Sequence, residues 1–203
     1  MSSSMSRPGA APDVAAGVRA AFPDLCRRIV AEIDGVLAAI EPDQVAALVE
    51  AILAARRTFV YGAGRGGLVM RGLAMRLMHL GLPVAVVGEM TTPPIGPSDV
   101  LLVNSAKGAG PTIEAIARAG RAAGATLAVI TAQPQAAVPA LAERVLVLPA
   151  QTLADAEGSR SFQPMGSAYE QALWVLCDAL AALLQTALGQ DAETMRARHT
   201  NLE

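Results

Sequence analysis

Two glycine-rich segments carry the side chains with which this chain of 203 residues could bind an anion. The first, residues 62–67, reads Gly-Ala-Gly-Arg-Gly-Gly, follows a short apolar run and precedes a helical pattern. This order is typical of a strand-to-helix turn whose backbone N–H groups hold phosphate. The guanidinium of Arg65 favours a compact anion, and a side chain that points into solvent is the alternative. Because only half of the dinucleotide-binding pattern is present, no nucleotide cofactor is expected.

The second segment, residues 104–112, also follows an apolar run and opens a helix. Its small residues would let the backbone approach a ligand, and Lys107 adds a positive charge. Lys107 is the only lysine among 16 cationic residues, which favours a ligand role, although an ordinary solvated lysine also fits the sequence. Loops that follow neighbouring parallel strands meet at one edge of a sheet, so the two segments predict a shared anion site.

A glutamate and a histidine are the candidate proton-transfer groups. Glu170 lies near the start of the last predicted helix, where a carboxylate beside the ligand loops could act as a base. A glutamate in that position also complements the helix dipole, which is the alternative role. His199 lies in a polar run near the C-terminus with no predicted core role. The other histidine, His79, falls on the apolar side of a predicted helix and is expected to be structural.

Alternating helices and buried strands must position these groups. Short apolar runs predict strands at residues 58–61, 84–87, 100–104, 125–131 and 144–148. Helical spacing of apolar residues predicts helices at residues 25–40, 43–56, 68–80, 112–123 and 164–188. The pattern predicts an α/β fold with a doubly wound sheet of about five parallel strands. Met70, Met75 and Met78 have helical spacing and are expected in the core.

Composition suggests one domain preceded by an arm. Residues 1–23 are rich in Ser, Ala, Gly and Pro and are expected to form a flexible arm, whereas residues 24–203 are expected to form a single domain. No segment is long and apolar enough to predict a membrane span. Cys26 and Cys177 match no metal-ligand spacing and are typical of buried thiols in a reducing compartment, so a cytoplasmic protein is expected.

The charge balance narrows the classes of partner. A formal net charge of −2 excludes nucleic-acid binding driven by bulk charge, because that mode needs a basic face. Only 17% of residues are charged, against 53% that are hydrophobic. This low charge indicates that other copies of the chain cover part of the apolar surface.

Four segments resemble the 6-phospho-3-hexuloisomerases, which belong to the sugar isomerase (SIS) domain family. They are residues 60–67, 74–81 (Ala-Met-Arg-Leu-Met-His-Leu-Gly), 86–93 (Val-Val-Gly-Glu-Met-Thr-Thr-Pro) and 197–203 (Ala-Arg-His-Thr-Asn-Leu-Glu). The resemblance covers nearly the whole chain from about Leu25. It implies an SIS-domain three-layer sandwich with flavodoxin-like strand order and a homotetramer with active sites shared between subunits. The activity implied is isomerisation, without metal or cofactor, between D-arabino-hex-3-ulose 6-phosphate and fructose 6-phosphate.

The resemblance also implies the roles of single residues. Glu170 would be the carbon base, and His199 of a neighbouring subunit would serve the substrate oxygens. The two loops themselves, together with the resemblance, give as expected substrate-binding residues Gly62, Gly64, Arg65, Gly66, Ser105, Lys107, Gly108 and Thr112. Glu89 ends a predicted strand close to the same crevice and could contact a sugar hydroxyl, and an exposed turn carboxylate is the alternative.

The chain departs from the family pattern in both loops. The family's first loop reads Gly-x-Gly-Arg-Ser-Gly, and this chain has Gly66 in place of the serine. The family's second loop reads Ser-Gly-Ser-Gly-Glu-Thr, and this chain has Lys107, Ala109 and Gly110 in place of its second serine, glutamate and threonine. Hydroxyl donors are lost and one cation is gained, so the anion could be held differently.

Two alternatives follow from the altered second loop. The chain could isomerise another anionic sugar, such as a pentulose phosphate or a sulfo- or carboxy-sugar. It could also bind a sugar phosphate without catalysis, although Glu170 and His199 would then have no use and no DNA-binding segment is present.

Overall fold

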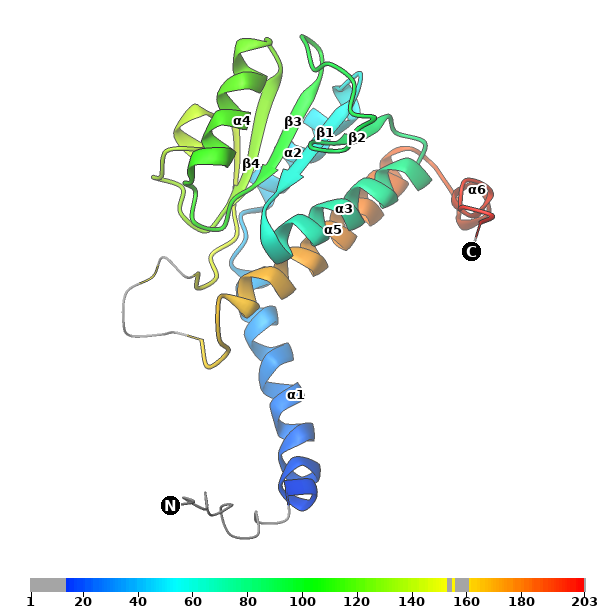
Figure 1. Ribbon diagram of the computed structural model, residues 1–203. Helices are drawn as coiled ribbons and strands as arrows, with labels where there is room; N and C mark the ends of the chain where they lie inside the picture. The colour runs from blue at the N-terminus through cyan, green and yellow to red at the C-terminus, as the bar shows by residue number, and fades with distance from the viewer. Residues whose placement is uncertain (1–13, 153–154, 156–160, 203) are drawn as a thin grey trace, which may run out of the picture.

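The computed structural model describes residues 14–152, 155 and 161–202. At its centre lies a sheet of five parallel strands in the order β2-β1-β3-β4-β5 (Figure 1). The strands are β1 (Thr58–Gly62), β2 (Val84–Val86), β3 (Val100–Asn104), β4 (Thr126–Thr131) and β5 (Arg144–Val147). β3 is buried along its whole length, as its uninterrupted apolar run predicts for a strand covered on both faces. The predicted doubly wound sheet and its flavodoxin-like strand order are therefore confirmed.

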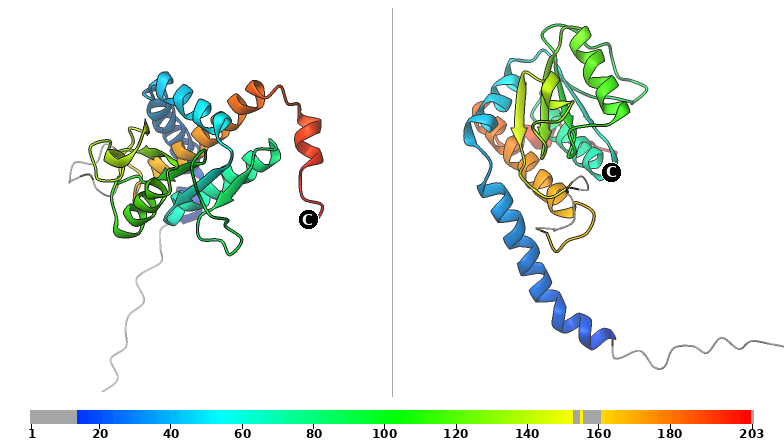
Figure 2. Two further views of the ribbon diagram at one scale, coloured as in Figure 1. Left: turned by 90° about the horizontal axis from the view of Figure 1, so that it is seen from above. Right: turned by 90° about the vertical axis from the view of Figure 1, so that its left-hand side faces the viewer.

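Helices cover both faces of the sheet (Figures 1 and 2). They are α1 (Val14–Ala38), α2 (Pro42–Ala54), α3 (Gly64–His79), α4 (Pro111–Ala122), α5 (Ser167–Ala187) and α6 (Ala192–Ala197), with a short 3₁₀ helix at Pro139–Leu141. α2, α3 and α5 share one core with the sheet, and α4 packs in a second core on the opposite face. None of the described helices is long and apolar enough to cross a bilayer.

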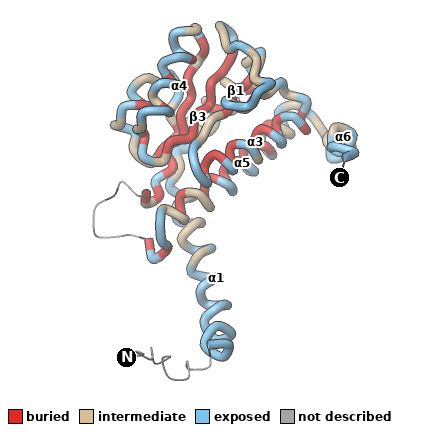
Figure 3. Tube along the Cα trace, viewed as in Figure 1, coloured by how far each residue is buried: buried red, intermediate tan, exposed pale blue. Residues whose placement is uncertain are grey.

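The N-terminal part of α1 projects from the body of the molecule (Figure 3). No residue of α1 is fully buried, although Ile33, Val36 and Leu37 near its C-terminal end pack against the core. The helix begins at Val14, whereas the sequence predicts a helix from residue 25 preceded by an arm. The alanine-rich residues 14–22 continue the helix toward the N-terminus, and Pro23 lies within it rather than ending it. The remainder of the predicted arm, residues 1–13, lies outside the described residues.

α3 begins at Gly64, four residues earlier than predicted. Residues 64–67, the last four of the first glycine segment, thus form the first turn of a helix rather than a loop. Met70 is buried on its inner face, but Met75 and Met78 are 45% and 40% exposed, so their prediction as core residues is wrong. Met70, Leu73 and Leu77 belong to a buried stripe whose members recur three or four residues apart. Met75 and Met78 lie away from this stripe. His79 is buried, as predicted.

Close packing explains the glycines where β1 meets α3. A Cβ atom on Gly67 would overlap the backbone carbonyl of Gly62, and the distance from a Cβ atom on Gly62 to the Cα of Gly67 would be only 3.0 Å. These contacts are between backbone atoms, which cannot turn aside as a side chain can. The first turn of α3 therefore lies against the end of β1 only because both residues are glycine.

We expect Gly67→Ala to lower the free energy of unfolding by about 1–3 kcal/mol, because the added methyl group forces the backbone of α3 away from β1. Gly35→Ala is the matched control: Gly35 also lies in a helix, is exposed, and has no atom within 4 Å of an added Cβ. That change should raise stability by roughly 0.4–1 kcal/mol. Urea unfolding monitored by circular dichroism measures both, and equal effects would contradict the packing argument.

Candidate functional site

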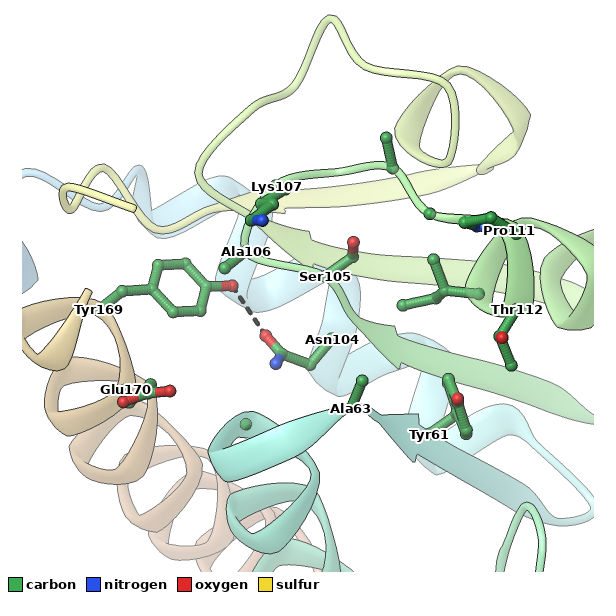
Figure 4. Close-up of a pocket in the computed structure, with 14 residues that line it drawn as sticks. Tyr61, Ala63, Asn104, Ser105, Ala106, Lys107, Pro111, Thr112, Tyr169 and Glu170 are labelled. Atoms are coloured by element: carbon green, nitrogen blue, oxygen red, sulfur yellow. Dashed lines mark hydrogen bonds between the residues drawn. The ribbon is translucent and has the colours of Figure 1, made fainter. Parts of the chain in front are cut away.

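A pocket of about 340 Å³ opens at the carboxyl ends of β1 and β3 (Figure 4). These strands pair in parallel with Gly62 opposite Asn104, so the two segments that follow them start side by side. The connections from β1 and β3 lead to opposite faces of the sheet, which makes this edge the topological switch point where α/β folds bind ligands. The two glycine segments lie at one pocket, as predicted.

Three helices begin at this pocket. Residues at or next to the N-termini of α3, α4 and α5 contribute to its walls: Ala63, Gly66, Pro111, Thr112, Tyr169 and Glu170. The first turn of a helix has N–H groups without intrahelical partners and carries a partial positive charge. At α4 one such group is occupied, because the N–H of Gly110 donates to the Glu114 carboxylate at 3.1 Å. The partial positive charge at the three helix N-termini favours an anionic ligand.

Glu170 reaches the pocket from the first turn of α5 and pairs with Arg65 of α3. The distance from Arg65 Nη1 to Glu170 Oε2 is 2.7 Å, and the same nitrogen lies 3.4 Å from Ser167 Oγ. The contact between Arg65 and Glu170 Oε2 lacks the direction of a hydrogen bond, so it is an electrostatic ion pair. The Arg65 side chain is 60% exposed, and at such exposure an ion pair contributes about 1 kcal/mol or less to stability. Arg65 therefore lies against Glu170 rather than on the pocket wall.

Behind Glu170, the buried hydroxyl of Tyr169 donates to Asn104 Oδ1 at 2.7 Å. Burial, and to a smaller extent the nearby Cys177, raises the pKa of the Tyr169 hydroxyl, which stays protonated at any physiological pH. Sequence analysis missed both members of this pair. The available signal was an asparagine at the end of the apolar run in β3, next to the predicted Ser105, since a polar residue at the carboxyl end of a buried strand often serves a site.

The loop after β3 is held by backbone hydrogen bonds. The N–H of Gly108 donates to the Ser105 carbonyl at 2.9 Å, and the Gly108 carbonyl accepts from the N–H of Val138 at 2.8 Å. Gly108 has a positive φ of 66°, and a Cβ there would lie 2.8 Å from the carbonyl of Gln133. Gly108 thus shapes the loop without lining the pocket, whereas Ser105 is buried in the wall and Lys107 is exposed at its edge.

Five of the predicted site residues line the pocket: Gly66, Ser105, Lys107, Thr112 and Glu170. Gly62, Gly64, Arg65, Glu89, Gly108 and His199 do not line it. Glu89 lies in an exposed turn beyond β2, where its N–H donates to the Val86 carbonyl. Gly64 has a positive φ of 56° and starts α3. Gly62, Gly64 and Gly108 thus shape the backbone around the pocket without lining it.

His199 lies at the other end of α3. Its ring stacks on that of His79, with 5.1 Å between the ring centroids. Arg198 fastens the tail there by donating to the His79 carbonyl at 3.0 Å and to Gln190 Oε1 at 2.6 Å. Since α3 has 16 residues and a helix rises about 1.5 Å per residue, its two ends are separated by about 24 Å. His199 therefore cannot serve the pocket of its own chain.

The described residues contain no group of three or more His, Cys, Asp or Glu side chains that could hold a metal ion. The pocket instead combines one carboxylate, hydroxyl and amide groups, helix N-termini and a cation. This set can bind an anionic, oxygen-rich molecule and can move a proton.

The chain is similar to proteins named 3-hexulose-6-phosphate isomerase. It is 41% identical over 172 residues to one from Mycobacterium gastri, a match covering 85% of this chain and 86% of the relative. It is 33% identical over 176 residues to one from Bacillus subtilis, covering 86% and 95%. No family model matches the chain.

Solved structures share the fold. A hypothetical protein from Methanococcus jannaschii, whose structure led to an inferred molecular function of 3-hexulose-6-phosphate isomerase, matches with a TM-score of 0.78 and 25% identity. That match covers 89% of this chain and 99% of the other. The sugar isomerase domain of an RpiR transcription factor from Sphaerobacter thermophilus matches with a TM-score of 0.65, covering 92% and 96%. At 20% identity this second likeness concerns the fold alone.

Proposed function

The chain belongs to the 3-hexulose-6-phosphate isomerase family of SIS-fold proteins, and from this membership we propose that it interconverts D-arabino-hex-3-ulose 6-phosphate and fructose 6-phosphate. The observation that carries the proposal is Glu170, a glutamate in the first turn of α5 that lines a pocket suited to an anion. The chain is 41% identical to a relative named 3-hexulose-6-phosphate isomerase. The match to this relative covers 85% of the chain, and the pocket contains a carboxylate that can move a proton.

The reaction moves a hydrogen between two adjacent carbons. In our proposal Glu170 removes the proton from the hydroxyl-bearing carbon beside the carbonyl, and the electrons of that C–H bond form the double bond of an enediolate. The carbonyl π electrons move to oxygen. Glu170 then returns the proton to the former carbonyl carbon. The neighbouring hydroxyl loses its proton and becomes the new carbonyl, the former carbonyl oxygen gains a proton and becomes a hydroxyl, and we assign this transfer between the oxygens to His199 of a neighbouring subunit. Arg65, in contact with Glu170, holds the carboxylate and balances its charge.

The substrate phosphate is proposed to bind where the loop after β3 meets α4. Ser105, Thr112 and the first turn of α4 offer donors there, and Lys107 supplies a positive charge at the edge. Lys107 has no hydrogen-bond or ion-pair partner among the described residues, so its ammonium is available to an anion. Glu89 does not line the pocket of its own chain, and we propose that it contacts the sugar when a neighbouring copy completes the site.

We further propose a cytoplasmic homotetramer with shared active sites. Apolar side chains are exposed along α1 (Val14, Val18, Phe22, Leu25 and Val30) and on α3 and α5 (Leu68, Met75, Trp174 and Leu183). An exposed apolar surface of this extent on a projecting helix is typical of a protein interface. His199, remote from the pocket of its own chain, would act on the substrate oxygens in a neighbour's pocket. The free thiols of Cys26 and Cys177 fit a reducing compartment.

Glu170→Gln should lower kcat by about 10²–10⁴-fold, because the amide keeps the shape of the side chain but cannot take a proton from carbon. Exchange of the substrate's carbon-bound proton in D₂O, followed by NMR, measures this step directly. Glu50→Gln, an exposed change on α2, is the control and should leave exchange as in the wild type. The proposal fails if the wild type exchanges no such proton, or if Glu170→Gln exchanges as fast.

Lys107→Ser should raise KM for the hexulose phosphate roughly tenfold, the effect of losing one charge-assisted contact worth about 1.4 kcal/mol. Inhibition by inorganic phosphate should weaken in parallel. Arg118→Ser removes the same charge from an exposed position on α4 outside the pocket and should change neither value. Stronger inhibition of the wild type by sulfate than by phosphate would instead favour the sulfo-sugar substrate.

Mixing two impaired variants tests the shared site. If His199 acts in a neighbour's pocket, refolding Glu170→Gln together with His199→Ala should restore about a quarter of wild-type activity, because random pairing rebuilds that share of intact sites. Each variant refolded alone should stay at its own low rate. Activity of the mixture equal to the mean of the two variants would show that each site is built within one chain.

A further inference from the structure

Two buried polar side chains of the pocket, Asn104 and Tyr169, have no part in the reaction as described above. Asn104 ends β3 and is 4% exposed, and Tyr169 lies in the first turn of α5 and is 1% exposed. Both line the pocket beside Glu170 (Figure 4). Burying polar groups is costly unless they are hydrogen-bonded, so such a pair in a pocket wall requires an explanation.

The hydrogen-bond pattern fixes the orientation of the Asn104 amide. The Tyr169 hydroxyl has one proton and two acceptors within reach, Asn104 Oδ1 at 2.7 Å and the carbonyl of Ile130 at 3.3 Å. The bond to Oδ1 is much the shorter of the two and receives the proton, so the amide turns its Nδ2 group to the opposite side.

The Nδ2 group occupies the space above Gly66. A Cβ atom built on Gly66 would overlap Asn104 Nδ2 before it met any other atom. Within the described part of the chain, Nδ2 donates to no protein acceptor, and Figure 4 shows it on the same side of the pocket as Glu170. Gly66, where the family loop carries serine, thus leaves room for an amide that has hydrogen-bond capacity to spare.

Resting on the proposed function, we propose that Asn104 Nδ2 donates a hydrogen bond to the substrate oxygen that becomes negatively charged in the enediolate. Tyr169 is a positioning residue that holds the amide, and Gly66 keeps its space open. When Glu170 removes the carbon-bound proton, negative charge appears on the former carbonyl oxygen, and the N–H of Asn104 stabilises it without transferring its own proton. An amide does not titrate, so this donor is present at every pH of interest.

The proposal predicts a large effect on kcat from a neutral side chain. Asn104→Ala should lower kcat by about 10²–10³-fold with a smaller change in KM, as expected when one donor to a developing oxyanion is removed. Gly66→Ser alone should also impair catalysis, because the new Cβ displaces the amide from its place.

The double variant Gly66→Ser with Asn104→Ala is the decisive test. Removal of the amide makes room for the serine, whose hydroxyl can donate from the same place, so the double variant should be at least about tenfold more active than either single variant. Such non-additivity is expected for residues that are in contact or share one cavity, and not for independent sites. Losses that multiply would overturn the proposal, and thermal unfolding of each variant shows whether any loss reflects misfolding.

A second cycle tests the role of Tyr169. Tyr169→Phe should lower kcat in the wild type but have no further effect in the Asn104→Ala background, where no amide remains to be held. A Tyr169 that only stabilised the fold would reduce activity equally in both. A wild type that turns over with additive variants overturns this inference alone, whereas a wild type without turnover on the hexulose phosphate overturns the proposed function and the inference together.

Discussion

The hydrogen bond between Tyr169 and Asn104 joins two parts of the chain that are 65 residues apart in sequence. It fastens the first turn of α5 to the carboxyl end of β3. Asn104, Ser105, Lys107, Tyr169 and Glu170, which supply most of the polar side chains in the pocket wall, lie within three residues of one of these two ends. Glu170 follows Tyr169 on the helix, and Ser105 follows Asn104 in the chain. Because the bond is buried, water cannot compete for it, so the separation between the carboxylate and the loop after β3 is set by one short contact.

The sequence predicted the sheet well and the pocket only in part. Buried parallel strands are continuous apolar runs, so β3 was found with its observed bounds and the other strands to within a residue or so. α3 was predicted to start too late, since glycines that are needed for contact with β1 looked like loop residues. Met75 was assigned to the core because spacing within one helix does not tell which side faces the sheet. The partner of Asn104 could not be predicted, because pairing over such a distance depends on tertiary packing.

Two of the departures from the family pattern, Gly66 and Lys107, have different physical consequences. The Asn104 amide occupies the space that a side chain at position 66 would need, so the absence of a side chain at Gly66 is coupled to the presence of this amide. Lys107 lies at the exposed edge of the pocket and competes with no neighbour for space. The first change alters the interior, where polar groups interact in a low dielectric, and the second alters the entrance, where water screens a charge.

α3 separates the pocket from the ring of His199 by a fixed length. Its first turn borders the pocket of its own chain, and its last residue supports the ring of His199 and accepts a hydrogen bond from Arg198. One residue inserted into α3 would move the tail by about 1.5 Å and rotate it by roughly 100° about the helix axis. The tail is joined to α5 through α6 but rests on the end of α3, so the length of α3 contributes to where the C-terminal histidine is presented.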